Sequence, residues 1–323
     1  MDDARRDDAA PIPLAEAIPV PHGRTAQRLQ WRFLPPGLRD RIEHELGSPV
    51  ADAASQNGGF TPGFASILTG ENGARLFVKA ASRGAQREIA ASYAEEARKL
   101  GLLGDAVPSP RLEWVLDEDG WVVLGFEALS ARTPRRPWRP AELASALDLA
   151  TEIAESTAEI PAGLELTPLA EDLPPLLTGW TTVPATWPHH AEVAELAASF
   201  ADVPADRFVH ADLRDDNVLL HEDGRALACD WNWPALGPVW IDAVVLMASA
   251  HGDGLDAEAL LASHPLTRDV DSEDVDRWLA ALCGFMLGAR TRAVPTNSPH
   301  LRTHAEWYAA TLWSWLATRR GWS

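Results

Sequence analysis

The chain reads FVHADLRDDNVLL at residues 208–220 and ACD at residues 228–230. The first segment contains the pattern H-x-D-x-x-x-x-N, and the second ends an apolar run with an aspartate. Asn217 follows Asp212 by five residues (217 − 212 = 5), and Asp230 follows Asp212 by 18 (230 − 212 = 18). A loop that leads into two short strands can bring these three polar side chains to one end of a sheet.

Phosphoryl transfer from a nucleotide needs this combination of groups. A carboxylate such as Asp212 can accept the proton of an attacking hydroxyl. The amide oxygen of Asn217 and the carboxylate of Asp230 can hold the magnesium ions that neutralise the phosphate charge. We therefore predict that Asp212 is the catalytic base and that Asn217 and Asp230 are metal ligands.

These segments resemble the aminoglycoside phosphotransferase family of kinase-like small-molecule phosphotransferases. The family pattern is H-G-D-x-x-x-x-N, followed by I-D-W, by G-P and by a further aspartate. The corresponding positions in this chain are His210-Ala211-Asp212, Asn217, Asp230-Trp231, Gly237-Pro238 and Asp242. Alanine at position 211 replaces the usual glycine, a small-for-small change that we expect to preserve function. The similarity extends over roughly residues 50 to 320, and its highly specific part is residues 208–242.

The resemblance implies an α+β, bilobal, protein-kinase-like fold, with a small antiparallel β-rich N-lobe and a larger α-helical C-lobe. We expect a loosely held arm at 1–24, an N-lobe at 25–129 that binds the nucleotide phosphates, and a C-lobe at 130–323. Alternating apolar residues and turn signals predict strands at 51–57, 64–68, 75–80, 111–116 and 121–126. Helical patterns are found at 38–46, 86–100, 141–157, 190–200, 238–250, 272–292 and 300–319.

Lysine is rare in this chain. Of 28 Lys and Arg residues only two are lysines, Lys79 and Lys99. Lys79 lies in the apolar run LFVKA at 76–80, after a glycine-rich turn at 57–63 that contains Gly58, Gly59 and Gly63. A compact ammonium group on a strand can reach nucleotide phosphates, and the run is similar to the V-A-I-K strand of kinases. We favour this role over a strand-end lysine that extends into solvent.

In kinases such a lysine pairs with a helix glutamate. The candidates in the helix predicted at 86–100 are Glu88, Glu95 and Glu96. The family places its glutamate in the context Y-x-x-E-A, which favours Glu96, with Glu95 as a competitor. The nucleotide base is expected where the N-lobe ends, and the residues predicted to bind it are Phe126, Glu127 and Leu129.

Three residues around Asp212 have roles that the resemblance suggests. His210 and Asp242 are expected to brace the catalytic loop rather than react. Arg214 is predicted to be catalytic by stabilising the γ-phosphate charge, because arginine suits phosphate. Pairing of Arg214 with Asp215 or Asp216 is an equally good alternative.

The bulk composition limits the partners. A net charge of −19 argues against binding to a nucleic-acid backbone and is compatible with a cationic substrate. The two cysteines give no disulfide framework. The N-terminus has no signal-peptide pattern, and the apolar run at 243–250 is too short to span a bilayer. We therefore expect a cytoplasmic protein without membrane partners.

The sequence favours an enzyme that uses ATP, or alternatively GTP, with Mg²⁺ to phosphorylate a hydroxyl group of a small molecule. Gly237 follows Asp230 by seven residues (237 − 230 = 7), which leaves no room for the activation segment of a protein kinase. The alternatives are a choline-, fructosamine- or sugar-type kinase on the same scaffold, and a nucleotide-binding pseudokinase.

Overall fold

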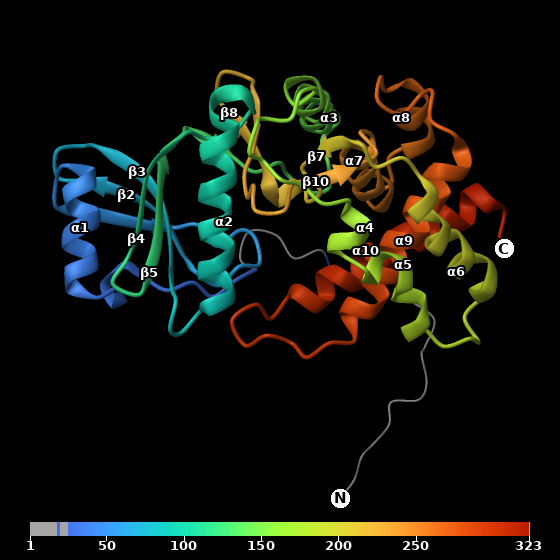
Figure 1. The fold of residues 1–323 in the computed structure, drawn as a ribbon, viewed down its shortest axis with the longest axis horizontal. Helices are drawn as coiled ribbons and strands as arrows, with labels where there is room; N and C mark the ends of the chain where they lie inside the picture. Colours follow the sequence, from blue (N-terminus) through green and yellow to red (C-terminus); the bar gives the residue numbers. More distant parts are fainter. Residues whose placement is uncertain (1–17, 20–24, 323) are drawn as a thin grey trace, which may run out of the picture.

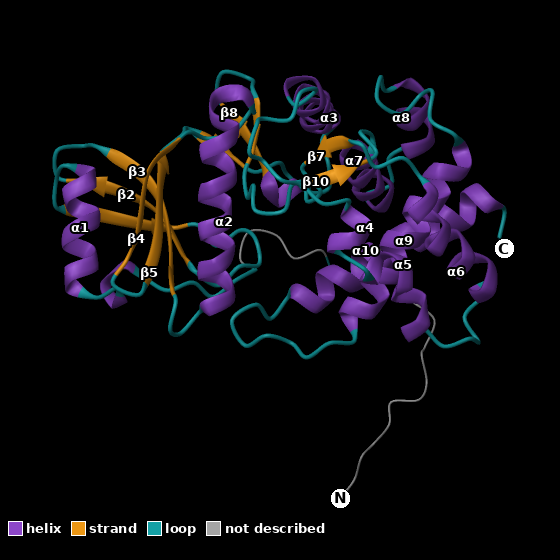
Figure 2. Ribbon diagram, in the orientation of Figure 1, coloured by secondary structure: helices purple, strands orange, loops and turns teal. Residues whose placement is uncertain are grey.

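Two parts of different secondary structure lie side by side in the chain (Figure 1). The structure is a computed structural model that describes residues 18–19 and 25–322. Most of the predicted arm at 1–24 therefore lies outside the described residues. The part that contains the sheet matches the expected N-lobe, and the mainly helical part matches the expected C-lobe (Figure 2).

The N-lobe is built on a five-stranded antiparallel sheet with the strand order β1-β2-β3-β5-β4. Its strands are β1 (Val50–Ser55), β2 (Phe64–Gly70), β3 (Arg75–Ser82), β4 (Leu112–Glu118) and β5 (Trp121–Glu127). The sheet carries α2 (Arg87–Leu103) between its third and fourth strands, as predicted. All five strand bounds agree with the sequence prediction to within two residues.

Strand alternation places Lys79 on the face of the sheet that α2 covers. Successive residues of a strand point to opposite faces. Leu76 and Val78 of β3 pack with Ile42 of α1 (Pro36–Leu46) in one apolar cluster. Phe77 packs in the other cluster, which contains Tyr93 of α2. In Figure 1, α1 lies at the outer side of the sheet and α2 lies between the sheet and the C-lobe.

The C-lobe is mostly helical and carries two small sheets. Its helices are α3 (Pro140–Ser156), α4 (Leu169–Asp172), α5 (Pro175–Thr178), α6 (His190–Ser199), α7 (Ile241–Gly252), α8 (Ala257–Ser263), α9 (Ser272–Arg290) and α10 (Leu301–Arg320). The first sheet has the order β6-β8-β9, from β6 (Ala131–Arg132), β8 (Val218–His221) and β9 (Ala226–Ala228). The second pairs β7 (Arg207–Val209) with β10 (Ala235–Gly237).

Short 3₁₀ turns connect several of these elements. They are η2 (Trp31–Phe33), η3 (Gly104–Ala106), η4 (Gly179–Thr182), η5 (Phe200–Asp202) and η6 (Asp215–Asn217). The turns, together with α4, α5, α8 and the β7–β10 pair, had no counterpart in the sequence prediction. Segments of three to seven residues are too short to display a hydrophobic period.

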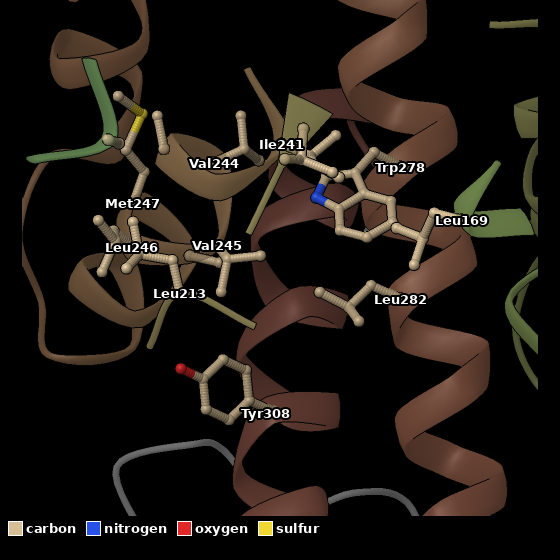
Figure 3. Packing of buried hydrophobic residues seen from close by; sticks show 14 of the residues in the cluster. Leu169, Leu213, Ile241, Val244, Val245, Leu246, Met247, Trp278, Leu282 and Tyr308 are labelled. Atoms are coloured by element: carbon tan, nitrogen blue, oxygen red, sulfur yellow. The ribbon is translucent and has the colours of Figure 1, made fainter. Parts of the chain in front are cut away.

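The core of the C-lobe is centred on α7. Every residue from 241 to 250 is buried, so the helix is covered on all sides and has no polar stripe. Figure 3 shows its apolar side chains together with Trp278 and Leu282 of α9. Leu213, the residue after Asp212, belongs to the same cluster and is fully buried. The core thus anchors the loop that carries the predicted base.

A close approach between η4 and α9 generates the first prediction. The indole N–H of Trp180 donates to the carbonyl of Ala280 at 2.8 Å, and a Cβ on Gly284 would lie 2.5 Å from Cδ1 of Trp180. We expect Gly284→Ala to lower the free energy of unfolding by about 1–3 kcal/mol, because overpacking forces both elements apart. Urea denaturation measures the effect.

Gly101→Ala is the matched control for this helix substitution. Gly101 lies inside α2, and nothing is within 4 Å of a Cβ at this position. We expect the alanine to stabilise the chain by about 0.5–1 kcal/mol, because glycine is the poorer helix former. A Gly284→Ala variant as stable as Gly101→Ala would contradict the close packing of η4 on α9.

Candidate active site

His210 connects the catalytic loop to the strand end that precedes Asp230. Its side chain is completely buried. Nδ1 accepts the backbone N–H of Asp212 at 3.3 Å, so Nε2 carries the proton that is donated to the carbonyl of Cys229 at 3.1 Å. Burial lowers the pKa of His210 to about 4, which keeps the ring neutral. These contacts give His210 a bracing position rather than that of a base.

Asp242 holds the same loop from the first turn of α7. Its carboxylate accepts the backbone N–H groups of His210 at 2.8 Å and of Ala211 at 3.0 Å. Asp242 is 4% exposed, and burial raises its pKa to about 6. Both contacts reach the point where the chain turns toward Asp212.

The backbone conformation of Ala211 adds a cost that the sequence did not reveal. Ala211 has a φ of 64°, in the left-handed region. This conformation costs a residue with a Cβ about 1–2 kcal/mol. The change from glycine to alanine is therefore not conformationally neutral, and the two N–H bonds to Asp242 help to hold the strained residue.

Asp212 and Asn217 are in direct contact. The Asn217 amide donates to Oδ2 of Asp212 at 3.0 Å and to its backbone carbonyl at 2.8 Å. The Asp212 side chain is 27% exposed, while Asn217 is buried. Burial raises the pKa of Asp212 to about 7, and the positive charge of Arg214 acts in the opposite direction.

Lys79 connects three separate elements through its ammonium group. Nζ lies 2.8 and 3.0 Å from the two carboxylate oxygens of Glu96 on α2 and also contacts Oδ1 of Asp230. Burial opposes the charge of Lys79, but Asp230 and Glu96 more than offset it and raise its pKa. Of the three glutamates considered, the structure pairs Glu96 with Lys79. Glu95 instead forms an ion pair with Arg98.

The second lysine of the chain approaches the same turn. Lys99 Nζ donates to the backbone carbonyl of Asn232 at 3.1 Å and is 9% exposed. Asp230 itself has a φ of 63°, a conformation that aspartate adopts more readily than most residues. Both lysines therefore extend from the N-lobe to the turn at 230–232.

Arg214 lies between two carboxylates. Its Nη1 is 2.8 Å from Oδ1 of Asp212, and its Nε and Nη2 are 3.0 and 3.2 Å from the two oxygens of Asp216. The structure thus places Arg214 against Asp216, one of the two partners considered, and beside the predicted base. Asp215 instead pairs with Arg136.

A cavity of about 440 Å³ lies beside Lys79, Glu96 and Asp230. Its lining includes most of the residues predicted to bind the nucleotide: Gly58, Gly59, Lys79, Glu96, Phe126, Glu127 and Leu129. Asp216 and Asp230 also line it, whereas Asp212, Arg214 and Asn217 are not among its lining residues.

Gly63, the third glycine predicted to bind the nucleotide, packs closely against its protein neighbours. It is not among the lining residues of this cavity. A Cβ on Gly63 would come within 2.6 Å of the Tyr93 hydroxyl and 3.3 Å of the Ala80 carbonyl. Close packing of the loop against α2 and β3 therefore requires a glycine at this position. A pattern of glycines in the sequence does not tell such packing from contact with a ligand.

Arg136 is a residue of the site region that sequence reasoning missed. It lies in the irregular segment between β6 and α3, yet its side chain is only 1% exposed. It binds Asp253 at 2.6 and 2.9 Å and Asp215 at 2.9 Å. Through Asp215 it attaches η6, which carries Asn217, to the end of α7. Clustered arginines in the segment were the only available signal.

The matching family over residues 63–272 is described as the phosphotransferase enzyme family. This match spans 210 of the 323 residues (272 − 63 + 1 = 210). The chain belongs to this family. It is a phosphotransferase of the kinase type, with hydroxyl groups as acceptors. Comparison with curated proteins gives no match.

Solved structures with the same fold include an aminoglycoside phosphotransferase from Alicyclobacillus acidocaldarius, with 16% identity and a TM-score of 0.53. That alignment covers 84% of this chain and 93% of the other. A choline kinase from Streptococcus pneumoniae aligns with 17% identity and a TM-score of 0.56, over 85% of this chain and 98% of the other. Both likenesses support the bilobal kinase-like fold predicted from the sequence.

None of the helices at residues 18–19 and 25–322 has the length and apolar composition needed to cross a membrane. The same residues contain no group of three or more His, Cys, Asp or Glu side chains arranged to hold a metal ion.

Asp242→Asn tests the bracing of the loop. The amide keeps the volume but has only one oxygen, so either His210 or Ala211 is left with an unpaired buried N–H. Such a group costs about 1–3 kcal/mol. We expect the free energy of unfolding to fall by this amount and the turnover rate to fall with it. Asp206→Asn, at an exposed position, should change neither. An Asp242→Asn variant with wild-type stability would contradict the bracing role.

Proposed function

We propose that the chain transfers the γ-phosphate of ATP, with Mg²⁺, to a hydroxyl group of a small molecule. The observation that carries the proposal is one interlobe cavity lined by Lys79 and Asp230. The Asp212–Asn217 pair is connected to this cavity through Arg214, which binds both Asp212 and the lining residue Asp216. Each type of group has a place in phosphoryl transfer, where positioning and charge neutralisation supply most of the catalysis. GTP is the alternative donor.

The residues beside the cavity suit a magnesium ion. Mg²⁺ prefers oxygen ligands and is commonly held by one or two carboxylates together with substrate phosphates and water. Asp230 supplies a carboxylate that is 36% exposed, and Asn217 supplies an amide close to Asp212. The bound ion would neutralise charge on the phosphates.

Asp212 is proposed as the base that accepts the proton of the acceptor hydroxyl. The raised pKa, about 7, places its protonation equilibrium near neutral pH, where a general base is effective. Asn217 and Arg214 hold one carboxylate oxygen each, so the carboxylate has a defined orientation. Arg214 is proposed to stabilise phosphate charge from the same position.

The remaining lining residues account for the nucleotide. Lys79 is proposed to contact phosphates, with Glu96 fixing its ammonium group. Phe126, Glu127 and Leu129 lie at the junction of β5 with the C-lobe and are proposed to surround the base. Gly58 and Gly59 belong to the loop that would cover the phosphates.

The acceptor is proposed to be a small cationic alcohol. The net charge of −19 favours the approach of cations. A second cavity of about 300 Å³ shares Gly58, Gly59 and Asp216 with the first and is also lined by the aromatic residues Trp307 and Tyr308. Aromatic faces can hold an ammonium group. Because of the structural likeness to a choline kinase, choline-type alcohols should be tested as acceptors after aminoglycosides.

The proposal is tested with a panel of aminoglycosides, amino sugars and choline-like alcohols, using ADP release as the readout. ATP and GTP are compared as donors in parallel. Transfer to at least one acceptor with Mg²⁺ is expected. Tight ATP binding without transfer to any of these acceptors would favour a pseudokinase instead.

Asp212→Asn is the sharpest test of the proposed base. The change is nearly isosteric and leaves Lys79 and Asp230 in place, so nucleotide affinity should survive. We expect kcat to fall by about 10²- to 10⁴-fold with little change in the KM for ATP. Asp269→Asn, in an exposed pair with Arg268, is the control and should behave as wild type. Wild-type turnover by Asp212→Asn would remove Asp212 from the mechanism.

Asp230→Asn tests the proposed metal site. The substitution removes one negative charge that faces the cavity. We expect the Mg²⁺ concentration for half-maximal activity to rise by about tenfold or more, as ligand-set changes typically do. A magnesium titration at saturating ATP measures this shift. An unchanged magnesium requirement would place the metal elsewhere.

A further inference from the structure

The segment before α1 crosses the glycine-rich loop that borders the cavity. The backbone N–H of Thr25 donates to the carbonyl of Asn57 at 3.0 Å, and the Thr25 hydroxyl contacts the carbonyl of Gly59. Arg28 Nη2 donates to the carbonyl of Gly58 at 2.7 Å. This segment lies outside residues 63–272, the part of the chain that matches the family.

The Arg28 guanidinium lies inside the nucleotide cavity. Arg28 lines it together with Lys79 and Asp230. A Cβ on Gly59 would lie 3.5 Å from Arg28 Nη2, so the guanidinium rests directly against the glycine-rich loop. The positive charges of Lys79 and Arg28 act in the same direction on the Asp230 carboxylate: burial alone would raise its pKa, and they lower it.

The guanidinium has unused donor capacity. Its Nε is buried and has no hydrogen-bond partner among residues 18–19 and 25–322. Within the same residues no carboxylate lies at ion-pair distance from Arg28, in contrast to Lys79 and Arg214, which have two carboxylates each. A buried unpaired donor is costly, and an unpaired cation beside a second cation is more so. An anion in the cavity would offer Arg28 both a hydrogen-bond acceptor and an opposite charge.

We propose that Arg28 binds the phosphate groups of the nucleotide together with Lys79. This inference rests on the proposed function and adds to it a phosphate-binding residue from the segment before α1. The planar guanidinium suits phosphate oxygens because it can donate two parallel hydrogen bonds. Lys79 is paired with Glu96 and Asp230, and Arg132, which also lines the cavity, is paired with Glu142. Arg28 therefore supplies positive charge that no carboxylate of the described residues already neutralises.

A purely structural role for Arg28 predicts a different result. If its bond to Gly58 only anchored the glycine-rich loop, any loss of loop anchoring would weaken all ligands of the cavity. Thr25→Val removes a neighbouring contact to Gly59 without removing charge. Comparing ligands with and without phosphates separates the two roles, because only phosphate binding depends on the number of phosphate groups.

The experiment is calorimetric titration of the full-length chain with Mg·ATP, Mg·ADP and adenosine. The variants are Arg28→Gln, Arg28→Lys, Thr25→Val and the control Arg32→Gln, which removes the same charge from an exposed position four residues later. We expect Arg28→Gln to weaken Mg·ATP by about tenfold or more, as loss of a charged hydrogen bond does, and to leave adenosine unchanged. Arg28→Lys should be intermediate, and Arg32→Gln should match wild type.

Two outcomes would overturn the inference while leaving the proposed function intact. One is wild-type ATP affinity in Arg28→Gln. The other is a parallel loss of ATP and adenosine affinity in both Arg28→Gln and Thr25→Val, which would make Arg28 a loop anchor only. A wild-type chain that binds no nucleotide would overturn the proposed function and the inference with it. Unfolding midpoints of all variants identify any that fail to fold.

Discussion

A single buried ammonium group holds the two lobes in a fixed relation. Lys79 is 6% exposed, and Glu96, its partner on α2, is 2% exposed. Taking such charges out of water costs several kcal/mol per ion unless each has a well-placed partner. Strand β3, helix α2 and the turn at Asp230 must therefore come together, and the cavity exists because they do. Because Glu96 and Asp230 neutralise the charge of Lys79, the proposed binding of nucleotide phosphates calls for a further cation, Arg28.

The catalytic loop depends on a second constraint, which comes from the core of the C-lobe. Ala211 and Asp230 both adopt left-handed backbone conformations. Such strain persists only where surrounding structure over-determines it. Helix α7 supplies this support, because its buried apolar side chains hold Leu213 and its Asp242 binds the loop backbone. Helix α7 thus positions the polar groups of the catalytic loop, which lie outside the helix.

Much of this arrangement could be predicted from the sequence, and the reasons are local. The strands and long helices display their periods, and the triplet of Asp212, Asn217 and Asp230 is recognisable by its spacing. Glu96 could be chosen by the residues around it. What the sequence did not show are contacts between single residues far apart in the chain, such as Arg136 with Asp253. An arginine in an irregular segment has no period and no motif. Gly63 shows a related limit, because a glycine in the sequence does not reveal which neighbouring atoms require it.

The scarcity of lysine has a consequence for the surface of the molecule. Both lysines are buried at the turn at 230–232, so every exposed side-chain cation of the described residues other than histidine is a guanidinium. Guanidinium groups keep their charge over the whole range in which proteins are handled. Reagents that acylate amines therefore have no exposed lysine to modify in the closed molecule. Lys79 lines the cavity and is 6% exposed, so the rate of its acylation becomes a measure of how freely the cavity admits a small reagent.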